Sequence, residues 1–469
     1  MHRRSPFRPE QAKKTLPSHL QIAIAGGGIG GLAAALALHR TSGCDVQLFE
    51  RAAAFEPLGA GLQLGPNVVR ILQRWGLGPA LARVAAFPER LEVRSAVSGQ
   101  CLATLPLGDA VVQRHGAAHA TVHRADLHAL LLQALTGTGE SGAGSDPGNN
   151  SGSVQIHLGT ALHSLAQDAR SVQLGFQSAA LASVEIPEPI FHRQADALIG
   201  ADGLWSTVRR QLLPGGPPQS TGHQAFRALL PQAALPAALR SHNAITAWLG
   251  PGLHAVGYPV RGGDWFNMVV IVQNRVLRQQ LGNPVSLELE ESAASAMAPA
   301  EAVAAALANS HCCNMLRDQV AAVEAANSTG WQRWPLFDRP PMRSPDEQVR
   351  GRIALLGDAA HPMRPYLAQG AAMAIEDAAE LAEWLGPIAL SKGATDRIPA
   401  ALQLYAQQRW QRNARVQARA ERNGRIFHAT GLVRWGRDAA LRLLGARILD
   451  MPWLYSHGRE APQRFPGER

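Results

Sequence analysis

Apolar positions near the start of the chain alternate between short strand-like runs and one helical stretch. Residues 21–25 form an apolar run, residues 29–40 an Ala/Leu-rich helix, and residues 45–50 a second apolar run that ends at Glu50. Two short apolar runs joined by a helix are typical of a βαβ unit, in which the strands are parallel neighbours. The pattern predicts that the chain opens with an α/β domain built on a parallel sheet.

This pattern changes in the middle of the chain and then returns. From about residue 214 to 345 the chain is richer in Pro and Trp, with strand-like runs at 244–249 and 265–272. They indicate a second domain, built on an antiparallel sheet and inserted into the first. After Arg350 an apolar run at 353–356 is followed by a helix with one apolar side. The first domain is therefore expected to be discontinuous.

A glycine-rich segment connects the first predicted strand to the first predicted helix. Gly26, Gly28 and Gly31 have the G-x-G-x-x-G spacing, and Glu50 ends the next strand. Gly26 permits a tight turn, Gly28 lets the backbone approach a pyrophosphate, and Gly31 lets the helix pack closely on the strand. Phosphates would bind at the helix N-terminus, and Glu50 would accept hydrogen bonds from ribose hydroxyls. The segment predicts a dinucleotide site, for either FAD or NAD.

Two later segments place a carboxylate directly after an apolar run. Asp202, in the sequence GADG, follows the run at 195–199, and Asp358, in GDAAHP, follows the run at 353–356. Ligands of parallel sheets bind at the carboxyl ends of the strands. We therefore expect both carboxylates near the bound dinucleotide.

The net charge and the composition indicate which classes of partner to expect. The formal net charge is +9, but the basic residues are spread along the chain and accompany no nucleic-acid motif. A positive field also concentrates small anions such as dinucleotides and aromatic carboxylates. We therefore expect small-molecule partners and no nucleic acid.

Cysteine usage and hydropathy indicate a cytoplasmic protein without metal or membrane. The four cysteines form no CxxC pair, and no His cluster has the spacing of metal ligands. No apolar run reaches the length of a membrane span, and the first residues lack the apolar centre of a signal peptide. The Arg- and Lys-rich start is read as a disordered tail; a mitochondrial presequence is the alternative.

Seven motifs in order carry a resemblance to a known family. The chain resembles the p-hydroxybenzoate-hydroxylase-type flavoprotein monooxygenases, and most closely their salicylate, 3-hydroxybenzoate and 6-hydroxynicotinate hydroxylase branch, from about Leu20 to Tyr405. The motifs are GGGIGGL, VQLFER, GAGLQLGPN, HRADLHALL, GADGLWSTVR, WPLFDRPP and LLGDAAHPMRPYLAQGAAMAIEDAAEL.

The resemblance implies an α/β fold with a Rossmann-like FAD-binding domain on a parallel sheet, an inserted antiparallel substrate domain and C-terminal helices. The expected units are a disordered basic tail (1–17), a discontinuous FAD-binding domain (18–88, 114–213 and 346–390, with a flexible loop at 136–153), a substrate domain (89–113 and 214–345) and a C-terminal helical region (391–469).

The resemblance also implies an activity. A tightly but non-covalently bound FAD would be reduced by NADH or NADPH, which visits and leaves, because only one dinucleotide fingerprint is present. The reduced flavin would trap O2 as a C4a-hydroperoxide and hydroxylate an aromatic ring, such as that of a hydroxybenzoate or a salicylate-like acid. The expected assembly is a monomer or a homodimer.

On the cofactor side, the resemblance assigns roles to residues of several motifs. Glu50 and Arg51 would hold the adenosine, and Arg124 would contact the pyrophosphate or the ribityl chain. The alternative for Arg124 is a surface ion pair with Asp126. Asp358 would bind a ribityl hydroxyl.

Further cofactor residues follow from the same motifs. Gly61 belongs to the cofactor-binding set, and Asp202 would lie near the pyrophosphate and help to bind the nicotinamide. The N–H groups of Gly370 and Ala371 would face N1 and the C2 carbonyl of the flavin, where the reduced ring carries negative charge. The alternative for Gly370 is a glycine needed only for chain turning. His361 is expected to pack structurally beside its loop.

On the substrate side, the residues have proposed roles with open alternatives. His223 is the candidate base that removes the phenol proton, and a structural histidine is its alternative. Gln63 and Tyr366 would line the ring pocket. Arg227 would clamp a carboxylate, or serve an internal ion pair. Pro365 would offer its carbonyl near the reactive face of the flavin.

Other functions stay open. One is an NAD-dependent dehydrogenase that uses the same glycine fingerprint, and another is a flavin-binding protein without turnover. Within the monooxygenases, the substrate is open between a hydroxybenzoate, a hydroxypyridine carboxylate such as 6-hydroxynicotinate, and a non-aromatic compound. The motifs mix features of these subgroups, so the sequence does not choose among them.

Overall fold

The computed structural model describes most of the chain. The described residues are 19–42, 44–56, 59–137, 152–178, 191–277, 297–391 and 394–456. The predicted tail at 1–17 and most of the predicted loop at 136–153 lie outside the described residues.

A six-stranded sheet forms the centre of the first unit. Its strands are, in spatial order, β18 (Val349–Arg350), β19 (Ile353–Leu355), β12 (Ala197–Gly200), β1 (Gln21–Ala25), β2 (Asp45–Phe49) and β8 (Val154–His157). All neighbours are parallel except β18 and β19. The predicted parallel sheet is confirmed, and its neighbouring strands β19, β12 and β1 come from distant parts of the sequence.

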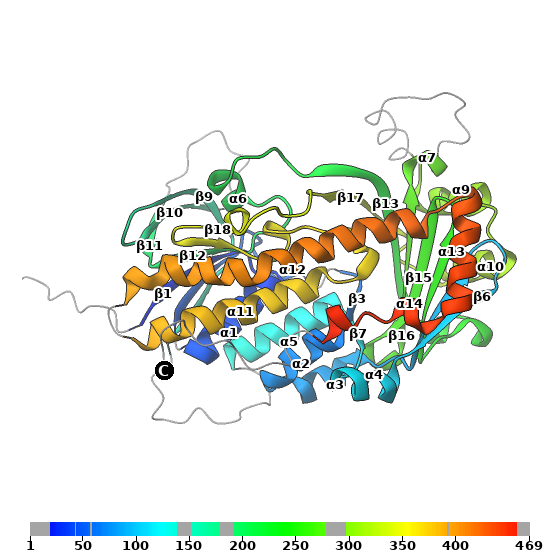
Figure 1. Cartoon of the computed structure of the whole chain (residues 1–469), viewed down its shortest axis with the longest axis horizontal. Helices are drawn as coiled ribbons and strands as arrows, with labels where there is room; N and C mark the ends of the chain where they lie inside the picture. Colours follow the sequence, from blue (N-terminus) through cyan, green and yellow to red (C-terminus); the bar gives the residue numbers. More distant parts are fainter. Residues whose placement is uncertain are drawn as a thin grey trace, which may run out of the picture.

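Helices cover one face of this sheet. Figure 1 shows α12 (Ile398–Phe427), α11 (Gly370–Leu390), α1 (Ile29–Ser42) and α5 (Arg124–Thr136) side by side, and neighbouring helices in this order are in contact. Leu32, Leu36 and Ile375 are fully buried where these helices pack. Burial of such an apolar layer is the main stabilising term of an α/β domain.

A small antiparallel sheet covers the opposite face. Its strands are β11 (Phe191–Ala195), β10 (Val172–Ser178) and β9 (Thr160–Gln167). The ring of Phe176 stacks on Phe49 of β2, with ring centroids 4.0 Å apart. Both faces of the central strands are therefore buried, as apolar strands such as β12 predict.

A seven-stranded sheet forms the second unit. Its strands are, in spatial order, β17 (Gln332–Asp338), β13 (Gln219–Pro231), β16 (Trp265–Gln273), β15 (Leu253–Val260), β14 (Ala244–Gly250), β5 (Arg90–Ser95) and β6 (Cys101–Pro106). The order confirms the predicted antiparallel sheet, except that β14 and β5 are parallel. They come from separate segments, so no hairpin turn imposes an antiparallel direction on them.

One face of the seven-stranded sheet is covered and the other is directed toward the first unit. Helices α9 (Pro299–Asn309) and α10 (Asn314–Ala326) bury Phe226, Met268 and Val270 of the sheet. Since strand side chains alternate between faces, the neighbouring positions Arg227, Val269 and His254 are directed to the other side, where the cavity described below lies.

A third, three-stranded sheet joins the two units. Strands β3 (Gly61–Leu64), β7 (Ala120–His123) and β4 (Ala85–Ala86) form it. The amide of Gly61 donates to Asn267 Oδ1 at 2.7 Å, and the Tyr258 hydroxyl donates to the Gly61 carbonyl at 2.7 Å. These bonds fix β3 against the seven-stranded sheet at the edge of the cavity.

The C-terminal helices span both units. Helix α12 runs along α11 and ends at the seven-stranded sheet, where α13 (Gly431–Leu444) packs against β6 (Figure 1). Within the described residues, no helix is both long and apolar enough to cross a membrane.

Candidate active site

The glycine-rich turn between β1 and α1 has the geometry of a phosphate site. Gly26 adopts φ +106°, and a Cβ atom there would lie 2.4 Å from the Ala201 carbonyl oxygen. A Cβ atom at Gly31 would lie 1.9 Å from the Gly26 carbonyl oxygen, whereas one at Gly28 would meet nothing within 4 Å. Gly26 and Gly31 are thus required by the chain itself, and Gly28 keeps space open at the helix N-terminus.

Glu50 supports this turn from the neighbouring strand. Its carboxylate accepts hydrogen bonds from the amides of Gly27 at 2.7 Å and Ala52 at 2.8 Å. The next residue, Arg51, is exposed. Roles of both residues toward an adenosine stay predictions.

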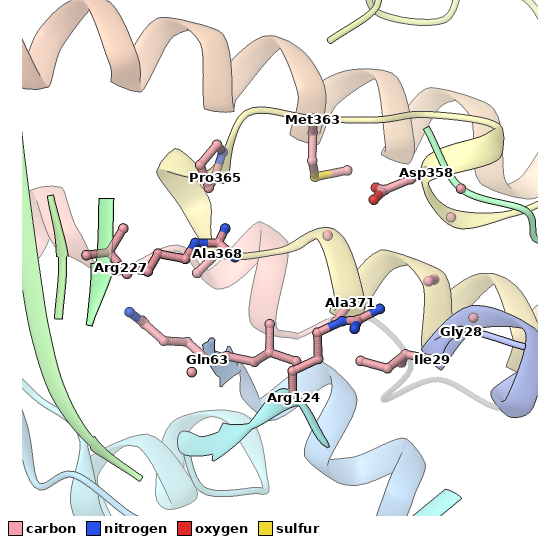
Figure 2. Close-up of a pocket in the computed structure, with 18 of the residues that line it drawn as sticks. Gly28, Ile29, Gln63, Arg124, Arg227, Asp358, Met363, Pro365, Ala368 and Ala371 are labelled. Carbon is pink, nitrogen blue, oxygen red and sulfur yellow. The ribbon is translucent and has the colours of Figure 1, made fainter. Parts of the chain in front are cut away.

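A cavity of about 390 Å³ begins at this turn and extends to the seven-stranded sheet. Figure 2 shows Gly28, Ile29 and Asp358 at one end, Gln63 and Arg227 at the other, and Arg124 and Ala371 between them. The cavity thus connects the predicted dinucleotide site to the second unit.

At the dinucleotide end, Asp358 offers a carboxylate to the cavity. Its carboxylate forms no hydrogen bond or ion pair with another described residue, and the side chain lines the hollow. Enclosure by protein raises the pKa of Asp358, and the charges of His361 and Arg124 oppose this effect. A carboxylate without a protein partner beside a hollow is suited to accept a hydroxyl hydrogen bond from a ligand.

Arg124 lies on the cavity wall. Asp126, the alternative partner considered from sequence, accepts hydrogen bonds from the Arg261 guanidinium, with Nε to Oδ2 at 2.9 Å. Arg124 lies between the two ends of the cavity (Figure 2), and its contact with a cofactor stays a prediction.

The N-terminal turn of α11 also opens onto the cavity. Gly370 and Ala371 line it, and Ala368, two residues before Gly370, has φ +51°. The first amides of a helix have no partner within the helix, so they can donate to a ligand that carries negative charge. This is the environment predicted for the flavin N1 and C2 carbonyl.

The carboxylate of Asp202 is hydrogen-bonded to other residues of the protein. Its oxygens accept from the Ser206 hydroxyl at 2.5 Å and from the amides of Thr207 and Val208 at 2.7 and 3.0 Å, which caps helix α6 (Thr207–Leu212). Burial raises the pKa of Asp202, against these hydrogen bonds. Its neighbour Gly203 lines the cavity instead, so Asp202 positions the turn, and a direct contact with a cofactor stays a prediction.

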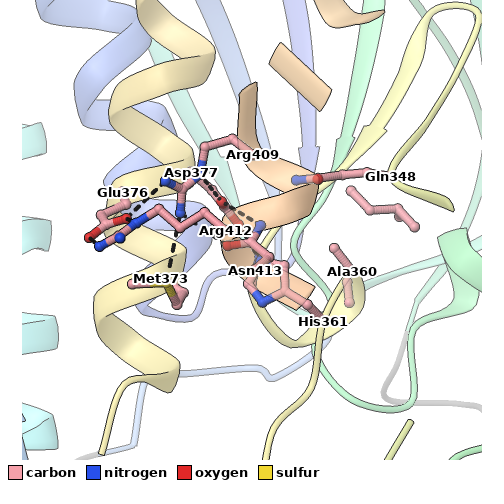
Figure 3. A network of polar contacts seen from close by, with 12 residues as sticks. Gln348, Ala360, His361, Met373, Glu376, Asp377, Arg409, Arg412 and Asn413 are labelled. Carbon is pink, nitrogen blue, oxygen red and sulfur yellow. Dashed lines mark hydrogen bonds and ion pairs between the residues drawn. The ribbon is translucent and has the colours of Figure 1, made fainter. Parts of the chain in front are cut away.

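A buried polar network holds the Asp358 loop (Figure 3). His361 Nε2 and the Gly357 amide donate to Asp377 Oδ2 at 2.5 and 3.1 Å, and Arg409 Nε donates to Asp377 Oδ1 at 2.7 Å. His361 is fully buried and does not line the cavity, in keeping with the structural role expected for it. The network connects the loop to α11 and α12.

At the substrate end, Arg227 extends from β13 into the cavity (Figure 2). It forms no hydrogen bond or ion pair with any other residue that the structure describes, and its Nε is buried without a partner. Its guanidinium lies 5.7 Å from the Trp334 ring centroid, and burial lowers its pKa. A cation that is largely removed from water and lacks an anion is costly, which indicates a ligand with negative charge.

Gln63 and Pro365 also line this end of the cavity, whereas His223 and Tyr366 do not. The structure does bring these two together: His223 Nδ1 hydrogen-bonds the Tyr366 hydroxyl behind the cavity wall. Burial lowers the pKa of His223 to about 4. The histidine on the wall is His254 of β15, which our reading of the sequence missed. The alternation of residues 253–260 places it on one face with Val256 and Tyr258, the only signal that the sequence offers.

The glycine turn at Gly28 and the open carboxylate of Asp358, both on one cavity, are features of oxidoreductases that bind a dinucleotide. Residues 19–420 match the family model of the FAD binding domain. The chain therefore belongs to the FAD-dependent aromatic hydroxylase family, and it is an FAD-dependent monooxygenase, as the resemblance implied.

Two relatives with known activities align with most of the chain. The chain is 34% identical to a 3-hydroxybenzoate 6-hydroxylase of Polaromonas naphthalenivorans (strain CJ2), over 94% of this chain and 96% of the relative. It is 35% identical to a 6-hydroxynicotinate 3-monooxygenase of Bordetella bronchiseptica, over 85% of this chain and 89% of the relative.

A solved structure supports the fold. A salicylate hydroxylase substrate complex superposes with a TM-score of 0.70 at 26% identity, over 94% of this chain and 96% of that one. The predicted fold class is confirmed by this match and by the sheets described above.

Proposed function

We propose that the protein hydroxylates an aromatic ring that carries both a hydroxyl and a carboxylate, with O2 and NADH or NADPH as co-substrates. The observation that carries the proposal is Arg227, a guanidinium in the cavity without a partner among the described residues. A carboxylate would accept two parallel hydrogen bonds from it and neutralise its charge. The substrate ring would then lie between Arg227 and the flavin end of the cavity.

The residues at the other end fit FAD. Gly28 leaves space for a pyrophosphate at the N-terminus of α1, and Asp358 can accept a ribityl hydroxyl. The amides of Gly370 and Ala371 would stabilise negative charge on the reduced ring. FAD supplies the chemistry that takes two electrons from the nicotinamide and activates O2.

The protein's own contribution is binding, orientation and the exclusion of water. Gln63 and the Pro365 carbonyl would border the ring between the two ends of the cavity. Apolar side chains Val256, Val269 and Ile271 form the floor of the cavity on the sheet, which keeps water from the reacting centre. The proton of the ring hydroxyl also needs an acceptor on the wall of the cavity.

The relatives favour two substrate classes. Their names specify a hydroxybenzoate and a hydroxypyridine carboxylate, and both classes combine a ring hydroxyl with a carboxylate. The hydroxybenzoate class is our first proposal, and the hydroxypyridine carboxylate is the second. A cytoplasmic monomer or homodimer is the assembly we propose.

A substrate panel tests the proposal. Purified holoenzyme is incubated with salicylate, 3- and 4-hydroxybenzoate, 6-hydroxynicotinate or benzoate, and both NADH and NADPH consumption and hydroxylated product are measured. We expect product from at least one hydroxy acid, and from benzoate only uncoupled oxidation of the nicotinamide with peroxide release. Turnover restricted to compounds without a ring hydroxyl would refute the substrate class but not the flavoenzyme assignment.

A further inference from the structure

Three histidines and one tyrosine form a buried cluster behind the cavity. His223, His254, Tyr366 and His428 are between 2% and 9% exposed. The His254 and His428 ring centroids lie 5.0 Å apart, and those of His254 and Tyr366 5.2 Å apart. In the described part of the chain, none of these four side chains hydrogen-bonds to an Asp or a Glu. Such a cluster of buried titratable groups is unusual and is not explained by packing alone.

Only one member of the cluster lines the cavity. His254 lies on the same face of the sheet as Arg227, because Arg227 pairs with Val269, Val269 with Val256, and His254 is two residues before Val256. Arg227 and His254 thus flank the central strand β16 from β13 and β15. Strand spacing places their Cα atoms roughly 10 to 12 Å apart, so that their side chains can meet opposite sides of one aromatic ring.

The hydrogen bond between the two histidines leaves one ring nitrogen of His254 for the cavity. His254 Nδ1 lies 2.8 Å from His428 Nε2. His254 Nε2 makes no hydrogen bond within the described part of the chain. Either histidine can be the donor of this bond; in the arrangement in which Nδ1 donates to His428, Nε2 of His254 carries a lone pair and can take a proton from a ligand.

We propose that His254 is the group that accepts the ring-hydroxyl proton of the substrate, and that His428 is the positioning residue that holds it in the accepting tautomer. This proposal rests on the proposed function. It differs from the sequence prediction, which gave the role to His223.

The chemistry balances with the co-substrates already named. One oxygen atom of O2 is transferred to the ring, and the other leaves as water with the two electrons of the nicotinamide. As the new C–O bond forms, the ring becomes electron-poor and the O–H bond of the existing hydroxyl breaks; its electrons form a carbonyl, and the proton goes to His254 Nε2. Loss of the ring C–H proton to solvent and return of the hydroxyl proton restore the aromatic diphenol.

The low basicity of this site is compatible with that step. Burial lowers the pKa of His254 to about 3, with a further contribution from His223, so the imidazole is neutral and available as an acceptor at physiological pH. A ring that is under electrophilic attack makes its hydroxyl strongly acidic, so that even a weak base removes the proton.

Single variants of the two candidate bases distinguish them. His254→Ala and His223→Ala are compared with the wild type for product formed per NADH oxidised, for flavin reduction with 3-hydroxybenzoate present, and for FAD retention. For His254→Ala we expect hydroxylation to fall by roughly 10²-fold while flavin reduction is nearly unchanged. Full hydroxylation by His254→Ala together with its loss in His223→Ala would overturn the proposal and restore His223 as the base.

A more conservative variant, His254→Gln, tests the same role if His254→Ala does not retain FAD. His254→Gln can accept a hydrogen bond but cannot take up a proton, so KM is expected near the wild-type value while kcat for product falls. A kcat equal to that of the wild type contradicts the proposal.

Variants of His428 test the positioning role. His428→Phe removes the acceptor for His254 Nδ1 and is expected to lower hydroxylation by about tenfold, the cost of one hydrogen bond near 1.4 kcal/mol. His428→Gln supplies an amide oxygen and should restore most of the loss; equal activity of the two variants would show a purely structural role. If the wild type itself forms no product from any acid of the panel, the proposed function fails. Failure of the His254 proposal alone differs from this, because the wild type then forms product while all variants retain FAD.

Discussion

Asp377 and Arg409 form an ion pair that is buried between helices α11 and α12, with Arg409 Nε 2.7 Å from Asp377 Oδ1. The other oxygen of Asp377 accepts from the Gly357 amide and His361 in the loop that carries Asp358. One carboxylate thus connects the C-terminal helix to the loop at the flavin end of the cavity (Figure 3).

Asp377→Asn should therefore destabilise the fold. It leaves the buried Arg409 with Glu376 as its remaining carboxylate partner, at 2.8 Å. Breaking one partner of a buried pair costs about 3–5 kcal/mol, measurable as a lower free energy of unfolding in urea, and FAD should dissociate more readily. Glu92→Gln is the matched control, since its partners Arg90 and Arg94 are 41% and 26% exposed; it should cost at most about 1 kcal/mol.

The difference between the wild type and Asp377→Asn should also depend on pH. Burial alone would raise the pKa of Asp377, but the charges of His361 and Arg409 and the hydrogen bonds outweigh it and lower the pKa to about 2. The stabilisation by this carboxylate is present above the unfolded-state pKa near 4 and is lost as the pH falls through about 2. Unfolding curves from pH 6 down to pH 2 should converge; a constant difference would contradict the assignment.

Two glycines of the same turn should respond differently to alanine. Gly31→Ala places a Cβ atom 1.9 Å from the Gly26 carbonyl oxygen and should destabilise the protein by several kcal/mol or prevent folding. Gly28→Ala meets open space in the protein, so thermal stability without FAD should be unchanged or slightly higher. Its methyl group would instead occupy the space for the pyrophosphate, and FAD titration should show weaker binding. Tight FAD binding by Gly28→Ala would show that the pyrophosphate lies elsewhere.

Glu50 is expected to contribute to FAD affinity. Glu50→Ala removes the acceptor for the Gly27 amide and would also remove the charge-assisted hydrogen bond that we predict between Glu50 and the ribose. A loss of about 1.5–3 kcal/mol corresponds to at least tenfold weaker FAD binding. The measurement is flavin fluorescence on dilution, with Arg51→Ala for comparison; unchanged retention in Glu50→Ala would exclude Glu50 as the ribose ligand.

Arg227→Ala should separate substrate binding from cofactor binding. Loss of the bidentate partner of the carboxylate is expected to raise KM for a hydroxy acid by roughly 10- to 100-fold, because a charged hydrogen bond is worth about 1.5–3 kcal/mol. FAD retention should not change, since Arg227 lies at the far end of the cavity (Figure 2). Arg227→Lys keeps the positive charge but cannot donate two parallel hydrogen bonds to the carboxylate, so its KM should be intermediate. An unaffected KM in both variants would remove Arg227 from the substrate site.

Local sequence patterns predicted several of the residues that meet at the cofactor end of the cavity, although Asp202, predicted beside them, caps α6 instead. The glycine spacing from Gly26 to Gly31 and the carboxylate of Asp358 after an apolar strand are short-range features, and the carboxyl ends of parallel strands meet at one edge of a sheet. The structure brings Gly28, Asp358 and Ala371 to one cavity, as these rules predict.

The substrate side depended on the tertiary structure. Alternation along residues 253–260 predicts which side chains share a face, but not what that face meets. His254 and His428 are 174 positions apart and become neighbours only because α12 crosses from the parallel sheet to the seven-stranded sheet. His223 and Arg227 lie on one face of one strand, yet the packing of Tyr366 places His223 behind the wall and leaves Arg227 in the cavity. The ordered sequence motifs thus determined the family, and with it the cofactor and the class of reaction, whereas the packing of distant elements decided which polar groups line the other end of the cavity.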